Sequence, residues 1–217
     1  MRSNQASAFR SQQFDYDDRQ SEMSKPQRLP PLEPSEFDPD AIAFAAKISG
    51  DFANQPGANQ SGKISDTFRT QFRHFPLFRA SMGLYTFLLT QGDLPDRDRE
   101  LIIMRVLWLC GSPNPYAPHV DIARKLGMDD DEIRRVQIGS NAPGWSEHDR
   151  YVLRGVEELY ERQALSDETW EILKRTWSDR QIMEFPALVG TYFMSAIVHN
   201  TMRTTMGDGN NGFRQID

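Results

Sequence analysis

The sequence predicts an all-α protein, and three features of the pattern support this. Apolar residues recur at helical spacing, as in Phe68, Phe72 and Phe75. No stretch alternates apolar and polar residues for long enough to indicate a strand. Capping residues stand where helices would begin, and glycines stand where they would end. We therefore expect a bundle or an orthogonal array of helices.

The composition limits the classes of function. The chain has 217 residues, enough for one large domain, and its net charge of −6 suits neither nucleic acid nor an anionic membrane. No apolar run reaches the ~18 residues that span a bilayer, and no apolar segment opens the chain as a secretory signal would. A single cysteine, Cys110, excludes an intramolecular disulfide, a CxxC redox pair and a multi-cysteine zinc site. We expect a cytoplasmic protein.

The composition also divides the chain into three parts. Residues 1–34 are polar, aperiodic and rich in proline, so we expect a flexible segment or an arm that packs on a neighbouring subunit. Residues 35–206 carry the helical pattern and form the predicted domain. Residues 207–217, GDGNNGFRQID, are expected to be a loose C-terminal tail.

Each helix of the domain is assigned from its apolar spacing and from the residues at its ends. The expected helices span residues 35–51, 65–75, 77–91, 95–111, 116–126, 130–137, 146–162, 166–177 and 178–205. The first begins at a capping residue, either Ser35 or Asp38. Pro76 separates the second helix from the third, which Gly92 closes.

Proline and glycine bound the next two helices. Pro95 opens the fourth helix and Gly111 closes it. Asn114 is the expected N-cap of the fifth helix, Pro115 suits its first position, and Gly127 ends it.

Serine residues cap the last three helices, which follow Ser146, Ser166 and Ser178. The final helix contains Pro186 and is apolar nearly all round. A helix of this kind is buried on several sides, so we expect its own domain and another subunit to cover it.

Two residues of the fourth and fifth helices could carry acid–base chemistry. Glu100 lies near the start of one helix, and His119, nineteen residues later, lies near the start of the next. A histidine near a carboxylate is a usable general base. The same pattern also fits a capped, hydrogen-bonded histidine and a surface glutamate that the helix dipole favours. In a straight antiparallel hairpin the two would miss each other, so they meet only if the helices cross or if another helix takes part.

The segments LPDRDRELIIMRVLWLCGS, HVDIARKLGM, WSEHDRYVLRGVEELYE, LSDETWEILKR and QIMEFPALVGTYFMSAIVHNTM resemble the carboxymuconolactone decarboxylase family, which includes the AhpD-like branch. The resemblance extends over about residues 28–206 and is most specific in residues 94–128. It implies an all-helical AhpD-like fold and a homo-oligomer, commonly a trimer or hexamer, with sites between helices and near subunit contacts.

The resemblance implies that Glu100 and His119 are the acid–base residues. The AhpD-like branch also uses two cysteines, and their positions fall on Ser112 and Pro115. The chain is therefore similar to the non-redox branch, whose members often read CGSEYEW where this chain reads CGSPNPY.

These observations favour a cofactor-independent lyase or decarboxylase-like enzyme that acts on a small carboxylated lactone or an aromatic catabolite, with no metal. His119 would move the proton and Glu100 would assist it. The expected substrate-binding residues are Arg97, Tyr116, Cys110, His74 and His199. Each also has a structural interpretation: Arg97, like Arg99 and Arg105, as a salt-bridge partner, His74 as a helix end, and His199 as a hydrogen-bonded core residue. A hydroperoxide reductase and a non-catalytic ligand-binding or scaffold protein remain as alternatives.

Overall fold

The computed structural model describes residues 25–51, 64–207 and 209–216. Every element of regular secondary structure in these ranges is a helix, so the all-α prediction is confirmed for the described residues. Most of the predicted N-terminal segment, residues 1–34, and most of the stretch between the first two predicted helices lie outside them. The α-helices are α3 (Pro39–Asp51), α4 (Asp66–Gln71), α5 (Phe75–Thr90), α6 (Asp96–Leu109), α7 (Pro113–Lys125), α8 (Asp130–Ile138), α9 (Glu147–Arg162), α10 (Asp167–Leu173) and α11 (Asp179–Met202). Three short 3₁₀ helices are η1 (Pro34–Glu36), η2 (Phe72–His74) and η3 (Gly212–Ile216).

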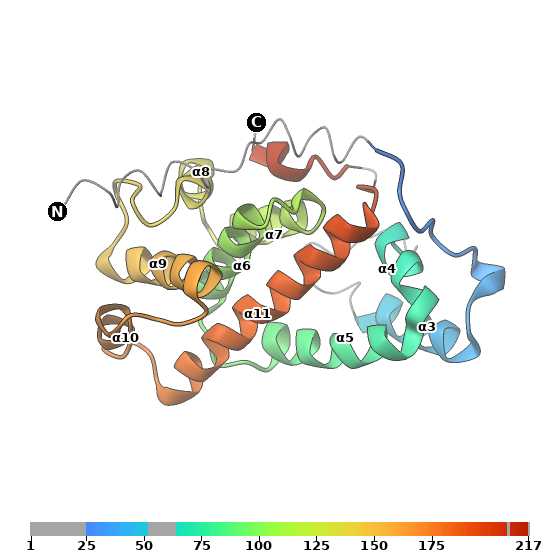
Figure 1. Ribbon diagram of the computed structural model, residues 1–217, viewed down its shortest axis with the longest axis horizontal. Helices are drawn as coiled ribbons and strands as arrows, with labels where there is room; N and C mark the ends of the chain where they lie inside the picture. Colours follow the sequence, from blue (N-terminus) through green and yellow to red (C-terminus); the bar gives the residue numbers. More distant parts are fainter. Residues whose placement is uncertain (1–24, 52–63, 208, 217) are drawn as a thin grey trace.

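Helix α6 forms the centre of the domain. It packs against α9, α7, α11 and α8, and the long helix α11 crosses the molecule diagonally (Figure 1). Six consecutive or nearly consecutive apolar residues of α6 have no exposed surface: Leu101, Ile102, Ile103, Met104, Val106 and Leu107. Burying a side chain of this size contributes roughly 1.5–3 kcal/mol. A helix that is apolar on all sides in this way is covered on all sides.

The predicted serine caps are present. The side chains of Ser146, Ser166 and Ser178 each accept a hydrogen bond from the backbone N–H three residues later. At Ser178 the Gln181 side chain returns the bond, which completes a capping box. These local bonds explain why the starts of α9, α10 and α11 agree with the sequence prediction.

Helix α7 begins earlier than predicted. Its N-cap is Ser112 rather than Asn114, and Pro113 lies in its first turn. The side chain of Asn114 is instead buried, and its Nδ2 donates to Thr204 Oγ1 (2.9 Å) and to the Thr205 carbonyl (3.0 Å). The Asn114 side chain therefore bonds residues far along the chain and does not cap α7 as the local sequence pattern predicts.

A second, smaller core lies at the N-terminal end of the described chain. Phe72, Phe75 and Phe78 form edge-to-face ring pairs with Phe37 and Phe44. The chain before η1 packs on this core and on α11: the Arg28 N–H donates to the Met202 carbonyl, and Arg69 Nε donates to the Leu32 carbonyl. The described part of the predicted arm thus lies against its own chain.

The prediction of a loose C-terminal tail is wrong for the described residues. Phe213 and Ile216 of η3 are buried, and the Phe213 ring lies edge-to-face on Trp108 (4.7 Å) and Tyr116 (4.9 Å). Arg134 Nη2 donates to the Ile216 carbonyl (2.9 Å). The segment is polar and rich in glycine, but its two apolar residues are spaced so that both enter the main core.

Helix α11 is, among the described residues, the one helix long and apolar enough to cross a membrane by length and composition. It packs against α6, α5, α7 and α9, and Phe185, Leu188 and Tyr192 are buried there. Burial in the main core therefore explains the apolar residues on one side of α11.

We expect the substitution Phe213→Ala to lower the free energy of unfolding by roughly 3 kcal/mol, because it removes a buried ring between two aromatic side chains. Urea denaturation followed by circular dichroism measures this. The control Ile138→Ala changes an apolar side chain that is 64% exposed and should cost less than about 0.5 kcal/mol. Equal effects of the two substitutions would contradict the packing of η3.

Candidate functional site

Glu100 and His119 meet in the interior, between α6 and α7. Glu100 Oε2 lies 2.7 Å from His119 Nδ1, and both side chains are buried, with Glu100 only 1% exposed. The interpretation of Glu100 as a surface glutamate is therefore wrong. A carboxylate oxygen can only accept a hydrogen bond, so the Nδ1–H group of His119 donates the hydrogen bond to Glu100 Oε2. This leaves Nε2 as the ring nitrogen available for proton exchange, and no described residue forms a hydrogen bond with it.

Two further side chains border the pair. Arg99 Nε lies 3.4 Å from Glu100 Oε1, and its Nη1 donates to Asp96 Oδ1 (2.7 Å). The Tyr192 ring of α11 meets the His119 ring edge-to-face, with centroids 5.1 Å apart. The site thus has an arginine on its carboxylate side and a phenol on its imidazole side. Sequence reasoning missed Tyr192, because a tyrosine among apolar residues of a long helix gives no signal of its own.

Arg97 does not point its charge at this site. Its Nη1 donates to Asp149 (2.7 Å) and its Nη2 to Glu132 (2.7 Å), so the guanidinium joins α6 to α8 and α9. Arg105 is buried in a similar way, on Glu157 and on the carbonyls of Val136 and Gln137. Both arginines form salt bridges, but with residues of other helices rather than with acidic residues of α6. The role of Arg97 as a substrate anchor stays a prediction, and its guanidinium is already paired with two carboxylates.

Tyr116 and Cys110 are both buried. The Tyr116 hydroxyl accepts from Gln137 Nε2 (3.4 Å), and burial raises the pKa of Tyr116 to about 12. The Tyr116 ring packs on Phe213, on the side of η3. Cys110 is the C-cap of α6, and its carbonyl accepts from Asn200 Nδ2 (2.9 Å).

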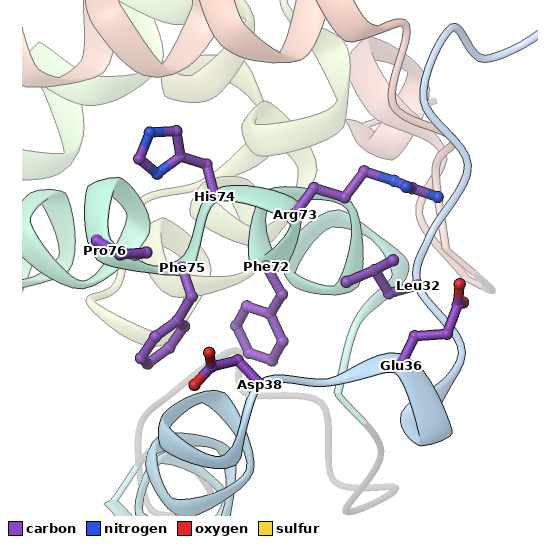
Figure 2. Close-up of a pocket in the computed structure, with 8 residues that line it drawn as sticks. All are labelled: Leu32, Glu36, Asp38, Phe72, Arg73, His74, Phe75 and Pro76. Carbon is purple, nitrogen blue, oxygen red and sulfur yellow. The ribbon is translucent and has the colours of Figure 1, made fainter.

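The two other predicted histidines have structural partners. His74 is exposed and caps α5, since its Nδ1 accepts from the Leu77 N–H (3.3 Å). Figure 2 shows it at an open hollow of about 480 Å³ beside η1 and η2, with its ring directed away from those of Phe72 and Phe75. His199 is buried and accepts from the Thr204 hydroxyl (2.8 Å), and burial lowers its pKa to about 4.

His148, in the first turn of α9, is partly buried, and both of its ring nitrogens have partners. Its Nε2 donates to Asp98 Oδ2 (2.8 Å), and its Nδ1 lies 2.9 Å from the Thr176 hydroxyl. The indole N–H of Trp177 donates to the same Asp98 oxygen (2.9 Å). The hydrogen bond to Asp98 raises the pKa of His148. This cluster joins α6, α9 and the start of α11.

Within the described ranges, no group of three or more histidine, cysteine, aspartate or glutamate side chains is placed to hold a metal ion. Two buried polar side-chain atoms there have no hydrogen-bond partner, Ser112 Oγ and Arg135 Nε. Ser112 is one of the two positions that the resemblance aligns with the cysteines of the redox branch.

Comparison with solved structures defines the class of fold. An uncharacterized peroxidase-related protein from Ralstonia eutropha JMP134, described as an alkylhydroperoxidase AhpD core, is 16% identical with a TM-score of 0.70, over 85% of this chain and 95% of that chain. A peroxidase-related protein from Silicibacter sp. TM1040 is 15% identical with a TM-score of 0.69, over 88% and 98% of the two chains. The debrominase Bmp8, in complex with 2,3,4-tribromopyrrole, is 16% identical with a TM-score of 0.69, over 89% and 100%. The fold is AhpD-like.

A family model matches part of the sequence. Residues 76–158 match the model of the Carboxymuconolactone decarboxylase family, and this stretch contains both Glu100 and His119. The match covers less than half of the chain, which has no CxxC pair because Cys110 is its single cysteine. No curated protein matches the sequence significantly.

We expect His199 to make the protein less stable as the pH falls from about 6.5 towards about 4. The unfolded chain binds a proton at His199 below its ordinary pKa of 6.5, whereas the folded chain does so only near pH 4. The loss approaches about 3 kcal/mol, at 1.36 kcal/mol per pKa unit. His199→Asn keeps an acceptor near the Nδ1 position and should remove this part of the pH dependence.

Urea denaturation at about pH 7 and about pH 5 measures the difference between the two proteins. His148 acts in the opposite direction: with a raised pKa, its stabilisation is complete below pH 6.5 and is lost as the pH rises through the folded-state pKa. It is present in both proteins and therefore cancels in the comparison. If the free energies of unfolding of wild type and His199→Asn changed with pH in parallel, the burial of His199 would not be the cause of the lower stability at acidic pH.

Proposed function

We propose that the protein is a cofactor-independent acid–base enzyme, a lyase or decarboxylase acting on a small carboxylated lactone or a related aromatic breakdown product. The observation that carries this proposal is the buried contact of 2.7 Å between Glu100 and His119. Glu100 fixes the tautomer and the orientation of the imidazole, and it balances the charge when His119 is protonated. Nε2 then exchanges the proton with the substrate.

This chemistry suits a decarboxylation. Loss of carbon dioxide from a lactone acid moves the bonding electron pair into a conjugated carbonyl and forms an enolate. The enolate carbon must then receive a proton, which His119 Nε2 can deliver. General acid–base catalysis of this kind typically contributes ~10²–10⁴-fold in rate.

A thiol-dependent hydroperoxide reductase is the weaker candidate, although two of the similar structures are described as peroxidase-related. Such an enzyme needs a reactive thiolate and a second thiol that restores it. Here Cys110 is buried at the end of α6, and Ser112 and Pro115 occupy the positions of the redox pair.

We expect His119→Ala to lower turnover at least about 100-fold while the protein remains folded. The assay is carbon dioxide release and substrate loss across a panel of lactone acids, with hydroperoxides tested in parallel. Glu100→Gln keeps the size of the side chain but removes the charge, and it should also lower turnover.

The matched control for this prediction is Cys110→Ser, which a non-redox enzyme tolerates with most of its activity intact. Activity confined to hydroperoxides and lost in Cys110→Ser would point to a peroxidase instead. A folded His119→Ala protein with undiminished turnover would refute the acid–base assignment.

We also propose that the chain forms a homo-oligomer through α11. One face of this helix is exposed and carries only apolar or small residues: Met183, Ala187, Gly190, Met194 and Ile197. Their spacing of four, three, four and three residues is that of the seam of a coiled coil, where helices pair. At Gly190 nothing lies within 4 Å of the position of a β-carbon, so a second helix has room to approach closely. The partner that this self-complementary stripe suits is a second copy of the chain.

Size-exclusion chromatography with light scattering tests this interface. The wild-type chain should be larger than the 25.0 kDa monomer, and Ile197→Glu should reduce the assembly because it places a charge in the apolar stripe. Ile138→Glu introduces the same charge at an exposed site on α8 and should leave the mass unchanged. A stable wild-type monomer in dilute solution would disprove the assembly.

A further inference from the structure

Tyr192 is a buried polar residue beside the Glu100–His119 pair, and the acid–base proposal leaves it without a role. It is 3% exposed, and no residue in the described ranges forms a hydrogen bond with its hydroxyl. Burial, with a contribution from the Glu100 carboxylate, raises the pKa of Tyr192 well above its ordinary value. The phenol therefore stays neutral, and its proton remains available for donation.

The neighbouring Tyr85 shows what a structural tyrosine does in the same place. The two rings lie edge-to-face with centroids 5.4 Å apart, and the Tyr85 hydroxyl donates to the Thr191 carbonyl (3.2 Å). The Tyr192 hydroxyl makes no such bond within the described ranges, and it is not one of the fully buried atoms without a partner, which are Ser112 Oγ and Arg135 Nε. Its O–H group is therefore free to donate a hydrogen bond to a molecule that binds beside the acid–base pair.

We propose that the Tyr192 hydroxyl is the third group of this site and donates a hydrogen bond to the substrate oxygen on which negative charge develops. This inference rests on the proposed function and narrows its substrate class to small conjugated carbonyl compounds that react through an enolate. When carbon dioxide leaves, the electron pair of the broken bond reaches the carbonyl oxygen, which accepts the hydrogen bond from Tyr192. Tyr192 keeps its proton throughout. His119, in the form protonated on both ring nitrogens, gives its Nε2 proton to the enolate carbon and regains one from water, and the hydroxide left combines with the carbon dioxide as bicarbonate.

Hydrogen-bond donors fixed where an oxyanion forms are worth more than the same donors in water, because they need no reorganisation during the reaction. Tyr192 is held by packing on α11 between His119 and Tyr85, so its position is set before the substrate arrives. Together, His119 and Tyr192 can act on the carbon and the oxygen of one enolate.

The test uses 4-nitrophenolate, a stable anion whose oxygen carries conjugated charge as an enolate oxygen does. Its visible absorption changes on binding and gives a dissociation constant without any turnover. We expect wild type to bind it and Tyr192→Phe to bind it about 10-fold to 100-fold more weakly, as for loss of a hydrogen bond to a charged group. The melting temperature of Tyr192→Phe should be unchanged or higher, because the hydroxyl removed has no protein partner.

Tyr85→Phe is the matched control. It removes a hydroxyl that is bonded to the Thr191 carbonyl, so it should lower the melting temperature by about 2–4 °C and leave 4-nitrophenolate binding unchanged.

Three results would overturn the inference: no binding of 4-nitrophenolate to wild type, equal binding to wild type and Tyr192→Phe, or a melting temperature of Tyr192→Phe that falls as that of Tyr85→Phe does. The outcome is separate from that of the proposed function. A His119→Ala protein with full turnover would refute the acid–base assignment, whereas the binding result reports on Tyr192 alone.

Discussion

Helix α6 is buried on every side, so each ionisable residue inside it needs a partner in the interior. An unpaired buried charge costs several kcal/mol, and this cost selects which elements may pack on α6. The three pairs are Asp98 with His148, Glu100 with His119, and Arg105 with Glu157. They connect α6 to α9, to α7 and again to α9. The candidate site is thus one of these three buried pairs that connect the central helix to its neighbours.

The three pairs differ in how completely their polar atoms are used. Glu157 also accepts from the backbone N–H and the hydroxyl of Ser140, and Arg105 also reaches two carbonyls, which makes this pair a closed structural bridge. The Glu100–His119 pair is left open, because His119 Nε2 has no hydrogen bond from any described residue. This open capacity beside a neutral buried phenol is the feature on which the proposed acid–base role of the pair rests.

The region that carries the redox cysteines in the AhpD-like branch has a packing role here. Pro113 packs against Gly212 so closely that a β-carbon added to Gly212 would lie 2.8 Å from the β-carbon of Pro113. The Asn114 side chain donates hydrogen bonds to the Thr204 hydroxyl and to the Thr205 carbonyl. The C-terminal segment therefore packs on the start of α7, and Phe213 extends this contact to Trp108. The fold is AhpD-like, while the segment that aligns with the redox cysteines is buried in the core.

The sequence by itself determined the features that depend on neighbouring residues. Helical spacing, prolines and serine caps predicted an all-α chain and the starts of α9, α10 and α11, because a cap bonds within three residues of itself. The resemblance to a family singled out Glu100 and His119, which spacing alone left undecided. Only the tertiary structure decided that these two meet, that Arg97 and His148 serve as links between helices, and that Tyr192 lies beside His119. It also decided that Asn114 leaves the cap of α7 and that the polar C-terminal segment is buried. The physical reason is the same in each case: a buried polar group takes the partner that packing brings to it, and packing joins residues that are far apart in the chain.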